Sequence, residues 1–398
     1  MSDHSPGPDK TSSAKPPPWN DPAVRSIAFQ IFAVALLGYF AYTLVDNMLS
    51  NMERRGIKTG FDFLSNEAGF DILMTLIDYS GDDTYGRTFV VGLLNTLLVA
   101  VIGIFFATII GFVMGIARLS NNWVIAKLAT VYIEIIRNIP LLLQMFFWYF
   151  AVLQVLPAVR QSIKFGDSFY LNNRGLYFPK PLFGDGFSLV VGAIVIAIVA
   201  IVFLKRWSKK RQEATGQQFP VFLTSLALLF GFPFIVFAAI GFPLTWEYAE
   251  LGRFSLQGGA RIIPEFMALF WALTMYTAAF IAEIVRSGIQ AVSHGQTEAA
   301  RALGLKNGPT LRLVIIPQAM RVIIPPLTSQ YLNLTKNSSL ATAIGYPDLV
   351  AVFMGTTLNQ AGQAVEIVLM TMAVYLTISL SISGVMNWYN NKVALVER

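Results

Sequence analysis

The uncharged stretch at residues 88–117 limits the fold of the chain more than any other feature. It contains no Asp, Glu, Lys or Arg, and a helix needs only about 20 consecutive apolar residues to cross the hydrocarbon core of a bilayer. Several other apolar runs exceed about 18 residues. Charged residues make up 13% of the 398-residue chain, whereas soluble domains carry about 25%. The sequence therefore predicts an all-α polytopic membrane protein embedded in a lipid bilayer.

Eight apolar runs account for this pattern. The spans are expected at about 27–47, 88–117, 138–158, 187–204, 219–242, 264–285, 322–345 and 365–386. Residues 1–26 contain three consecutive prolines and are expected to form a disordered tail. The first apolar run lacks a convincing small-residue cleavage site, so we interpret it as a retained anchor rather than as a signal peptide. The outward loops at 48–87 and 157–186 are expected to form a surface cap.

The basic residues favour one orientation of these spans. With the amino terminus inside the cell, the inward segments hold 18 of the 29 Lys and Arg residues, and the outward segments hold 10. Cytoplasmic loops of membrane proteins carry such an excess. Both termini, the basic cluster at 205–211 and the loop near residue 298 are therefore expected to be cytoplasmic. We interpret the net charge of +6 as this orientation signal, and we expect no nucleic-acid partner.

Several kinds of catalytic site are excluded by composition. The chain has no Cys, so it has neither a thiolate metal site nor a thiol nucleophile. Its two His residues, His4 and His294, are too few for a typical zinc or haem site. No Gly-x-x-x-x-Gly-Lys-Ser/Thr phosphate-binding loop occurs. We therefore expect that the chain is not itself an enzyme and that it contains no catalytic residue, metal site or cofactor.

A short polar segment between two apolar runs, residues 296–317, carries the strongest functional signal. Its residues predict a helix from about Glu298 that stops at Gly304, a turn at 307–308, and a second helix opened by Pro309. Two adjacent alanines would allow another chain to approach closely, and glycine would allow a sharp exit. A carboxylate placed early in a helix is favoured by the helix dipole.

This segment resembles the EAA loop of the membrane subunits of binding-protein-dependent ABC importers. The residues that carry the resemblance are Glu298, Ala299, Ala300, Gly304 and Pro317. Val at position 314 and Ile at position 316 replace the usual Ile and Leu. The resemblance implies that the segment is a coupling loop, which receives movement from an ATPase subunit, with proline shaping the return into the membrane. The alternative is an ordinary cytoplasmic helix hairpin.

Two further stretches resemble the permeases of polar amino-acid importers. Residues 132–150 are similar to their second core helix, with Asn138 in place of the usual Gly. Residues 282–301 and 317–340 are similar to their later core segments. The resemblance covers 86–390 and is interrupted by an insertion near 159–262.

Removing the two inserted spans leaves a five-helix core of the type-1 ABC importer kind. The chain would then divide into a disordered cytoplasmic tail at 1–26, a helix with a periplasmic loop at 27–85, the transmembrane domain at 86–390 and a cytoplasmic tail at 391–398. This eight-span architecture resembles the longer permease subunit of general L-amino-acid importers, in the histidine and glutamate type of permease.

The resemblance implies a permease of the bacterial inner membrane that moves amino acids in an ATP-driven cycle. Its implied partners are a pair of ATP-binding subunits, a second homologous permease and a periplasmic amino-acid-binding protein. ATP and magnesium would bind to the partner ATPase. The competing class is a secondary transporter or channel that works alone, which predicts inverted repeats and intramembrane carboxylates. The sequence shows no clear repeat, and most acidic residues lie in loops.

Three polar residues within the seventh expected span are candidates for a translocation path. They are Lys336, Asn333 and Gln330. An ionisable group at membrane depth is costly unless it faces water or a partner, which favours a position along the path. Alternatively, the polar run lies at the outer interface and caps a helix. The sequence does not decide between these two interpretations.

Some residue pairs carry structural rather than functional expectations. Local ion pairs are expected for Glu134 with Arg137 and for Glu283 with Arg286, each spaced i,i+3. The pair Pro325-Pro326 is expected to break or kink the seventh span.

Overall fold

The computed structural model describes residue 19 and residues 21–54, 56, 59–166, 168–252 and 255–393. Within these residues, seven helices are long and apolar enough to span a membrane, or eight if one bent pair forms a single span. This confirms the expected polytopic helical fold. The tails expected at 1–26 and 391–398 lie mostly outside the described residues. Helix α1 (Pro22–Arg54) already begins at Pro22, so the last part of the expected amino-terminal tail is helical.

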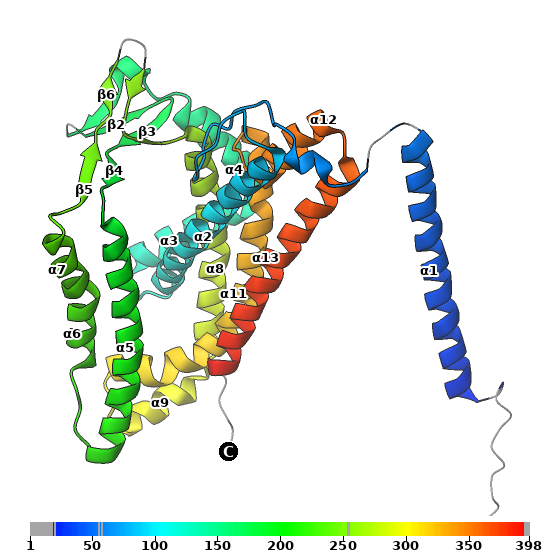
Figure 1. Ribbon diagram of the computed structural model, residues 1–398. Helices are drawn as coiled ribbons and strands as arrows, with labels where there is room; N and C mark the ends of the chain where they lie inside the picture. The colour runs from blue at the N-terminus through cyan, green and yellow to red at the C-terminus, as the bar shows by residue number, and fades with distance from the viewer. Residues whose placement is uncertain are drawn as a thin grey trace, which may run out of the picture.

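The spanning helices follow the expected apolar runs (Figure 1). They are α1, α2 (Tyr85–Arg118), α5 (Phe187–Thr215), the helix formed by α6 (Val221–Leu226), a π-helical segment (Ala227–Gly231) and α7 (Phe232–Ala239), α8 (Pro264–Gln290), the continuous helix Asn307–Ile344, and α13 (Ala364–Val393). The bent pair is α3 (Trp123–Asn138) followed by α4 (Leu141–Phe146) and a π-helical segment (Phe147–Leu153).

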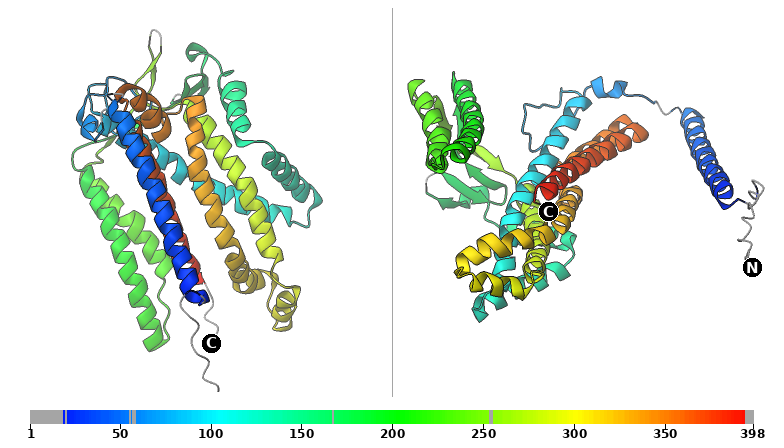
Figure 2. Two further views of the ribbon diagram at one scale, coloured as in Figure 1. Left: turned by 90° about the vertical axis from the view of Figure 1, so that its right-hand side faces the viewer. Right: turned by 90° about the horizontal axis from the view of Figure 1, so that it is seen from below.

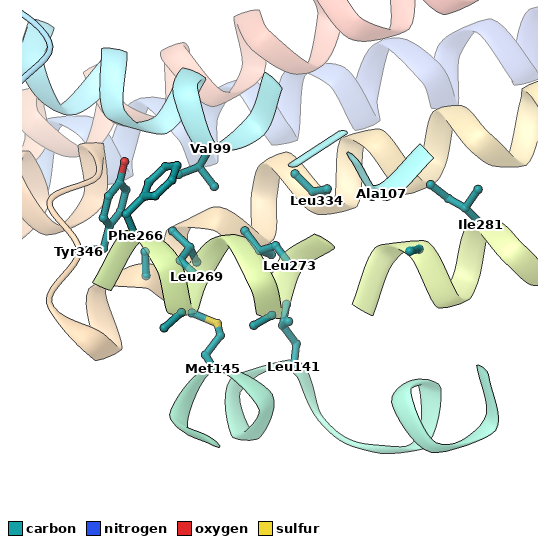
Figure 3. Close-up of a cluster of buried hydrophobic side chains, with 14 of the residues drawn as sticks. Val99, Ala107, Leu141, Met145, Phe266, Leu269, Leu273, Ile281, Leu334 and Tyr346 are labelled. Atoms are coloured by element: carbon teal, nitrogen blue, oxygen red, sulfur yellow. The ribbon is translucent and has the colours of Figure 1, made fainter. Parts of the chain in front are cut away.

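Helix α8 lies at the centre of the core. Most of its buried residues are small or apolar, and small residues let helix backbones approach closely within a membrane. The buried side chains labelled around it in Figure 3 include Val99 and Ala107 of α2, Leu141 and Met145 of α4, and Leu334 and Tyr346 from the segment after α10. Helices α2, α4, α8 and Asn307–Ile344 therefore share one apolar core.

The third expected span, at 138–158, begins at a sharp bend. The chain turns by 106° between α3 and the helix at Leu141–Leu153. Pro140 explains the turn, because proline lacks an N–H group and disfavours helical geometry at the preceding residue. Ile139 is accordingly extended, with φ −99° and ψ 127°. The helix at Leu141–Leu153 therefore lies within the expected span, and α3 is a separate helix that precedes it at a steep angle.

The buried side chain of Gln144 stabilises this turn. Its Nε2 atom donates hydrogen bonds of 2.9 Å to the carbonyl oxygens of both Ile136 and Ile139. These carbonyls lie at the end of α3, where the proline interrupts the helical hydrogen-bond ladder. One amide side chain thus satisfies two carbonyl groups at the turn.

Replacing Gln144 with leucine is expected to destabilise the fold by about 2–6 kcal/mol, because two carbonyl groups would lose their donor at a cost of about 1–3 kcal/mol each when buried. The measurement is the denaturation midpoint of the purified chain in detergent. Gln212→Leu on the exposed surface of α5 is the control and should leave the midpoint unchanged. Equal midpoints for all three proteins would contradict this role of Gln144.

The seventh span is longer than expected and is one continuous helix. It combines α10 (Asn307–Thr310), a π-helical segment (Leu311–Ile315), α11 (Ile316–Asn337) and a 3-10 segment (Ser338–Ile344). Of the break or kink expected at Pro325-Pro326, the break is absent, because α11 continues through both prolines. The π-helical segment lies directly before Pro317, where wider winding accommodates a residue that cannot donate a backbone hydrogen bond.

The insertion between the third and sixth spans also contains short strands, which the sequence analysis did not predict. They are β1 (Ile163–Phe165), β2 (Phe169–Asn172), β3 (Gly175–Phe178), β4 (Lys180–Phe183), β5 (Leu244–Glu247), β6 (Glu250–Leu251), β7 (Leu256–Gln257) and β8 (Ala260–Ile262). One antiparallel sheet has the order β1-β2-β3-β8, and two smaller pairs are β4-β5 and β6-β7. These strands lie at the opposite end of the molecule from α9 (His294–Ala302), as Figures 1 and 2 show.

Candidate functional site

The candidate coupling segment forms a short helix, α9, that leaves the end of α8 and turns back into α10. Helix α9 begins at His294, four residues before the expected start at Glu298. Glu298 is therefore more than one turn inside the helix, and the expected dipole interaction at the helix start does not apply. Residues 307–308 were expected to form a turn but are the first residues of α10. The turn itself lies between Leu303 and Lys306.

The expected stop at Gly304 agrees with the structure. Gly304 has a φ of +77°, a left-handed conformation that is costly for other residues. The N–H of Gly304 bonds to the carbonyl of Arg301 at 2.9 Å, and the N–H of Leu305 bonds to that of Ala300 at 3.1 Å. This pair of bonds is a Schellman motif, which ends a helix sharply and satisfies its last carbonyls.

The two faces of α9 differ in exposure. Ala300 is buried against the segment that follows α10, whereas Glu298 and Ala299 are exposed. The side chain of Glu298 is 69% exposed, and its Oε1 atom lies 3.1 Å from Nδ1 of His294. Leu303, which the sequence analysis did not single out, is 81% exposed at the tip. An exposed leucine beside a small-residue helix face is a surface that another protein could cover.

Helix α9 is tied to the start of α11 by side chains. Nε2 of Gln318 donates to Oε1 of Gln296 at 3.1 Å. Pro317 lies beside this contact, in the first turn of α11. Because Asn307–Ile344 is one continuous helix, a displacement of α9 has a direct mechanical route along that helix into the core.

An ion-pair network lies where α2, α3 and α8 end. Nη1 of Arg118 is 2.5 Å from Oε2 of Glu283, and its Nη2 is 3.1 Å from Oε1 of Glu134. The expected pairing of Glu283 with Arg286 is present. Glu134 pairs with Arg118 rather than with Arg137, whose guanidinium lies over the ring of Phe280. The network therefore joins three helices instead of forming two local pairs.

The candidate path residues lie near the other end of α11. Lys336 is in its last turn, about 30 Å along the helix from Ile316 at 1.5 Å per residue. Lys336 and Asn333 are exposed and Gln330 is half-buried, and the three-residue spacing places them on one side of the helix. Lys336 also borders a hollow of about 410 Å³ with Tyr375 and Thr371 of α13. The two interpretations of this group stay open on this geometry.

A buried carboxylate that the sequence analysis missed fixes the segment between the last two spans. Oδ1 of Asp348 accepts a 2.8 Å hydrogen bond from the N–H of Ala351, and Oδ2 lies 3.4 Å from the hydroxyl of Tyr375. Burial raises the pKa of Asp348 to about 7. Since the folded chain holds this proton more tightly than the unfolded chain, the contribution of Asp348 to stability falls as the pH rises from about 4 to 7.

Asn95 and Thr96 of α2 hold the same segment. Nδ2 of Asn95 donates to the carbonyl oxygens of Pro347 at 2.8 Å and Met74 at 2.9 Å. The hydroxyl of Thr96 accepts a 3.0 Å bond from the N–H of Leu349. These contacts join α2 to two segments that are distant in the sequence, so no local sequence pattern predicts them.

Among the described residues, no group of three or more His, Asp or Glu side chains is arranged to hold a metal ion. The structure does offer two candidate surfaces. One is the exposed elbow of α9, formed by Glu298, Ala299 and Leu303 at one end of the bundle. The other is the polar side of α11, formed by Gln330, Asn333 and Lys336 near the other end.

Comparison with known proteins finds a matching family and similar permeases. Residues 215–395 match the family described as binding-protein-dependent transport system inner membrane component. The chain is 57% identical over 378 residues to the General L-amino acid transport system permease protein AapQ of Rhizobium johnstonii, covering 95% of this chain and 94% of that protein. It is 56% identical over 378 residues to the Putative amino-acid ABC transporter permease protein YhdX of Escherichia coli, covering 95% and 96%.

These matches include most of the insertion, because the uncovered share of the chain is shorter than residues 159–262. Among solved structures, a crystal structure of an amino acid ABC transporter with histidines has a TM-score of 0.45 and 21% sequence identity. That match covers 77% of this chain and 95% of the other.

Proposed function

The chain belongs to the binding-protein-dependent transport system inner membrane components, as a permease of the amino-acid ABC transporter type, and on this premise we propose that ATP-binding partner subunits drive its transport cycle through α9. The observation that carries the proposal is the exposed elbow of Glu298, Ala299 and Leu303. It is a compact projection that ends at a glycine with positive φ, and a short turn at 303–306 joins it to the continuous helix Asn307–Ile344 of the core.

The proposed orientation places α9 in the cytoplasm. In Figure 1, α9, the turn between α5 and α6, and the end of α13 all lie at one end of the molecule. These are the segments that carry the inward excess of Lys and Arg, a distribution typical of cytoplasmic loops. ATP-binding subunits would then reach α9 from inside the cell, and both termini would be cytoplasmic in the bacterial inner membrane.

The proposed division of the chain follows from the same geometry. The transmembrane domain at 86–390 would contain the five core spans, namely α2, the bent span, α8, Asn307–Ile344 and α13. Helix α1 and the hairpin of α5 with α6–α7 would be additions to it. The apolar stretches of α1 and α6–α7 are the least buried of the spans, at 0% and 6%, which supports a peripheral role for them, whereas that of α5 is 17% buried, the same share as for α13.

A second homologous permease would cover the polar side of α11. Lys336 and Asn333 expose polar groups on a membrane-spanning helix, which is unfavourable against lipid. A path between two permeases would give both groups access to water. The periplasmic binding protein would deliver the amino acid to the end that carries the strands. ATP and magnesium would be bound by the ATPase pair and not by this chain.

We expect Lys336→Cys to be labelled by a small thiol reagent at a rate that changes at least about threefold between the resting transporter and the transporter held with ATP, because a path residue gains or loses water as the path opens. The chain has no Cys, so the label reports one site only. Val322→Cys, on the exposed side of α11 nearer α9, is the control. A labelling rate that does not change when substrate or ATP is added would support the outer-interface interpretation instead.

The whole proposal is tested by uptake of labelled amino acids in vesicles. The chain is reconstituted with the second permease, ATP-binding subunit and binding protein encoded beside it. Uptake that needs all components and ATP is the expected result. Uptake by this chain without any ATPase would favour a secondary transporter or channel and overturn the proposal.

A further inference from the structure

The hairpin of α5 with α6–α7 packs mainly on itself. The two helices contact each other along their length, and they are joined to the rest of the described chain through the strand pair β4-β5. Figures 1 and 2 show the hairpin standing beside the core helices. Lipid is therefore the natural environment for most of its apolar surface.

The inner end of α5 lies where the hydrocarbon core should end. Residues 187–204 are uncharged, and at 1.5 Å per residue they span about 27 Å, close to the core thickness of about 30 Å. The basic cluster follows at once, and α5 continues as a helix through it to Thr215. The cluster is therefore held on a rigid helix at headgroup level, at the same end of the molecule as α9 (Figure 1).

The positive charge of this cluster is not neutralised within the described part of the chain. Lys205, Arg206 and Lys210 have no carboxylate partner there, and Lys209 has only a 3.9 Å contact with Glu213 in which both side chains are exposed. Exposed pairs of this kind contribute little. Four cationic side chains thus remain available to an anionic partner.

Aromatic side chains and a hollow complete the surface. The ring of Trp207 packs against Phe219 with centroids 5.4 Å apart, and the guanidinium of Arg211 lies over it at 5.4 Å. A hollow of about 600 Å³ beside Trp207 is bordered by Phe203 on its apolar side and by Arg206, Lys209 and Lys210 on its basic side, where three cationic side chains outnumber the one carboxylate, Glu213. Tryptophan is typical of the membrane–water interface.

We propose that this surface binds the phosphate headgroup of an anionic phospholipid, with the acyl chains along the apolar part of α5 near Phe203. An orientation signal alone needs only basic residues in a loop. Here the basic residues are instead arranged with an interfacial tryptophan around a hollow that is apolar toward the membrane and cationic toward water. Basic clusters directly beside a membrane helix attract anionic lipid by about 1 kcal/mol per residue. The proposal does not depend on coupling to an ATPase.

The test uses the full chain in vesicles of equal parts phosphatidylglycerol and phosphatidylcholine, followed by native mass spectrometry of the lipids that stay bound. The wild-type chain should retain phosphatidylglycerol in preference to phosphatidylcholine. The variant Lys205→Gln/Arg206→Gln/Lys209→Gln/Lys210→Gln should lose this preference by about tenfold or more. The double variant Lys209→Gln/Lys210→Gln should lose part of it and removes fewer orientation signals.

The matched control removes four basic side chains at the other end of the insertion. It carries the changes Lys164→Gln, Arg174→Gln, Lys180→Gln and Arg261→Gln, and it should retain phosphatidylglycerol like the wild type. Equal loss in the control would mean that net charge alone attracts the lipid, and a wild type without preference would mean that no site exists. Loss of the ATPase subunit from the quadruple α5 variant, with lipid retention unchanged, would assign the cluster to a protein contact. Each of these three results overturns the proposal.

A variant of the coupling helix separates this test from the proposed function. Glu298→Arg should leave phosphatidylglycerol retention unchanged even if it abolishes transport. The results can therefore overturn the proposed lipid site without overturning the proposed transport function, and they can also do the reverse.

Discussion

Replacing Glu298 with arginine is expected to lower ATP-driven uptake at least about 100-fold while leaving the amount of folded permease in the membrane unchanged. The side chain is 69% exposed, and its one described contact is with His294, so folding should not depend on it. A reversed charge in a closely docked interface costs several kcal/mol, and each 1.4 kcal/mol is a factor of ten in an equilibrium constant.

The control for this prediction is Glu213→Arg. Glu213 is similarly exposed, at 65%, and it also faces a basic side chain four residues away on a helix at the same end of the molecule. It lies outside α9, so uptake should stay within about twofold of the wild type. Uptake rates and permease amounts are measured in the same membranes. If Glu298→Arg transports normally, or if both variants lose transport equally, α9 is not the specific contact.

The second large effect is expected at Gly115 of α2. A Cβ atom at this position would lie 2.6 Å from the carbonyl oxygen of Ala282 and 2.8 Å from Cβ of Val285 on α8, whereas nonbonded atoms prefer about 3.5–4.0 Å. Gly115→Leu would therefore push α2 away from α8, the central helix of the core. The expected loss exceeds about 3 kcal/mol, which is the upper end for overpacking a core and a large share of a typical stability of 5–15 kcal/mol.

Gly384→Leu is the matched control for the glycine contact. Gly384 lies within α13, and a Cβ atom there would meet no other atom within 4 Å. Both substitutions add the same apolar volume to a spanning helix, so insertion into the membrane should be favoured equally. The fraction of monodisperse protein after extraction is the measurement. Gly115→Leu should lose most of it and Gly384→Leu should keep it, and similar fractions for the two would refute the close contact of α2 with α8.

The spans could be predicted because each needs only a long apolar run. Helix α8 was expected at 264–285 and extends over Pro264–Gln290, and α2 was expected at 88–117 and extends over Tyr85–Arg118. The bend at the start of the third span was not predicted although Pro140 was visible, because the apolar run continues across the bend. The strands were missed because each has only two to four residues, too few for an alternating pattern to stand out.

Helix α9 could be singled out as the candidate coupling helix because its signal is local. Glu298, Ala299, Ala300 and Gly304 lie within seven residues of one another, and the glycine predicts the helix end by its backbone freedom alone. The partners of Gln144 and Asp348 could not be predicted in this way. The partners of Gln144 are only five and eight residues away, but they come within reach because the chain bends at Pro140, and that bend was not predicted. The contact of Asp348 with Tyr375 depends on where α13 and the segment after Gly345 meet in space, which a single sequence does not mark locally.

Helix α9 is proposed to touch an ATP-binding subunit on the inner side of the membrane. Because the chain has no Cys, Leu303→Cys offers a single cross-linking site at the exposed tip of this elbow, and Trp246→Cys on β5 offers one at the opposite end. In the assembled transporter, a bifunctional thiol reagent should join Leu303→Cys to the ATP-binding subunit and should not join Trp246→Cys to it. Labelling of Leu303→Cys by a membrane-impermeant reagent added outside intact cells, with no cross-link to the ATPase, would contradict the account.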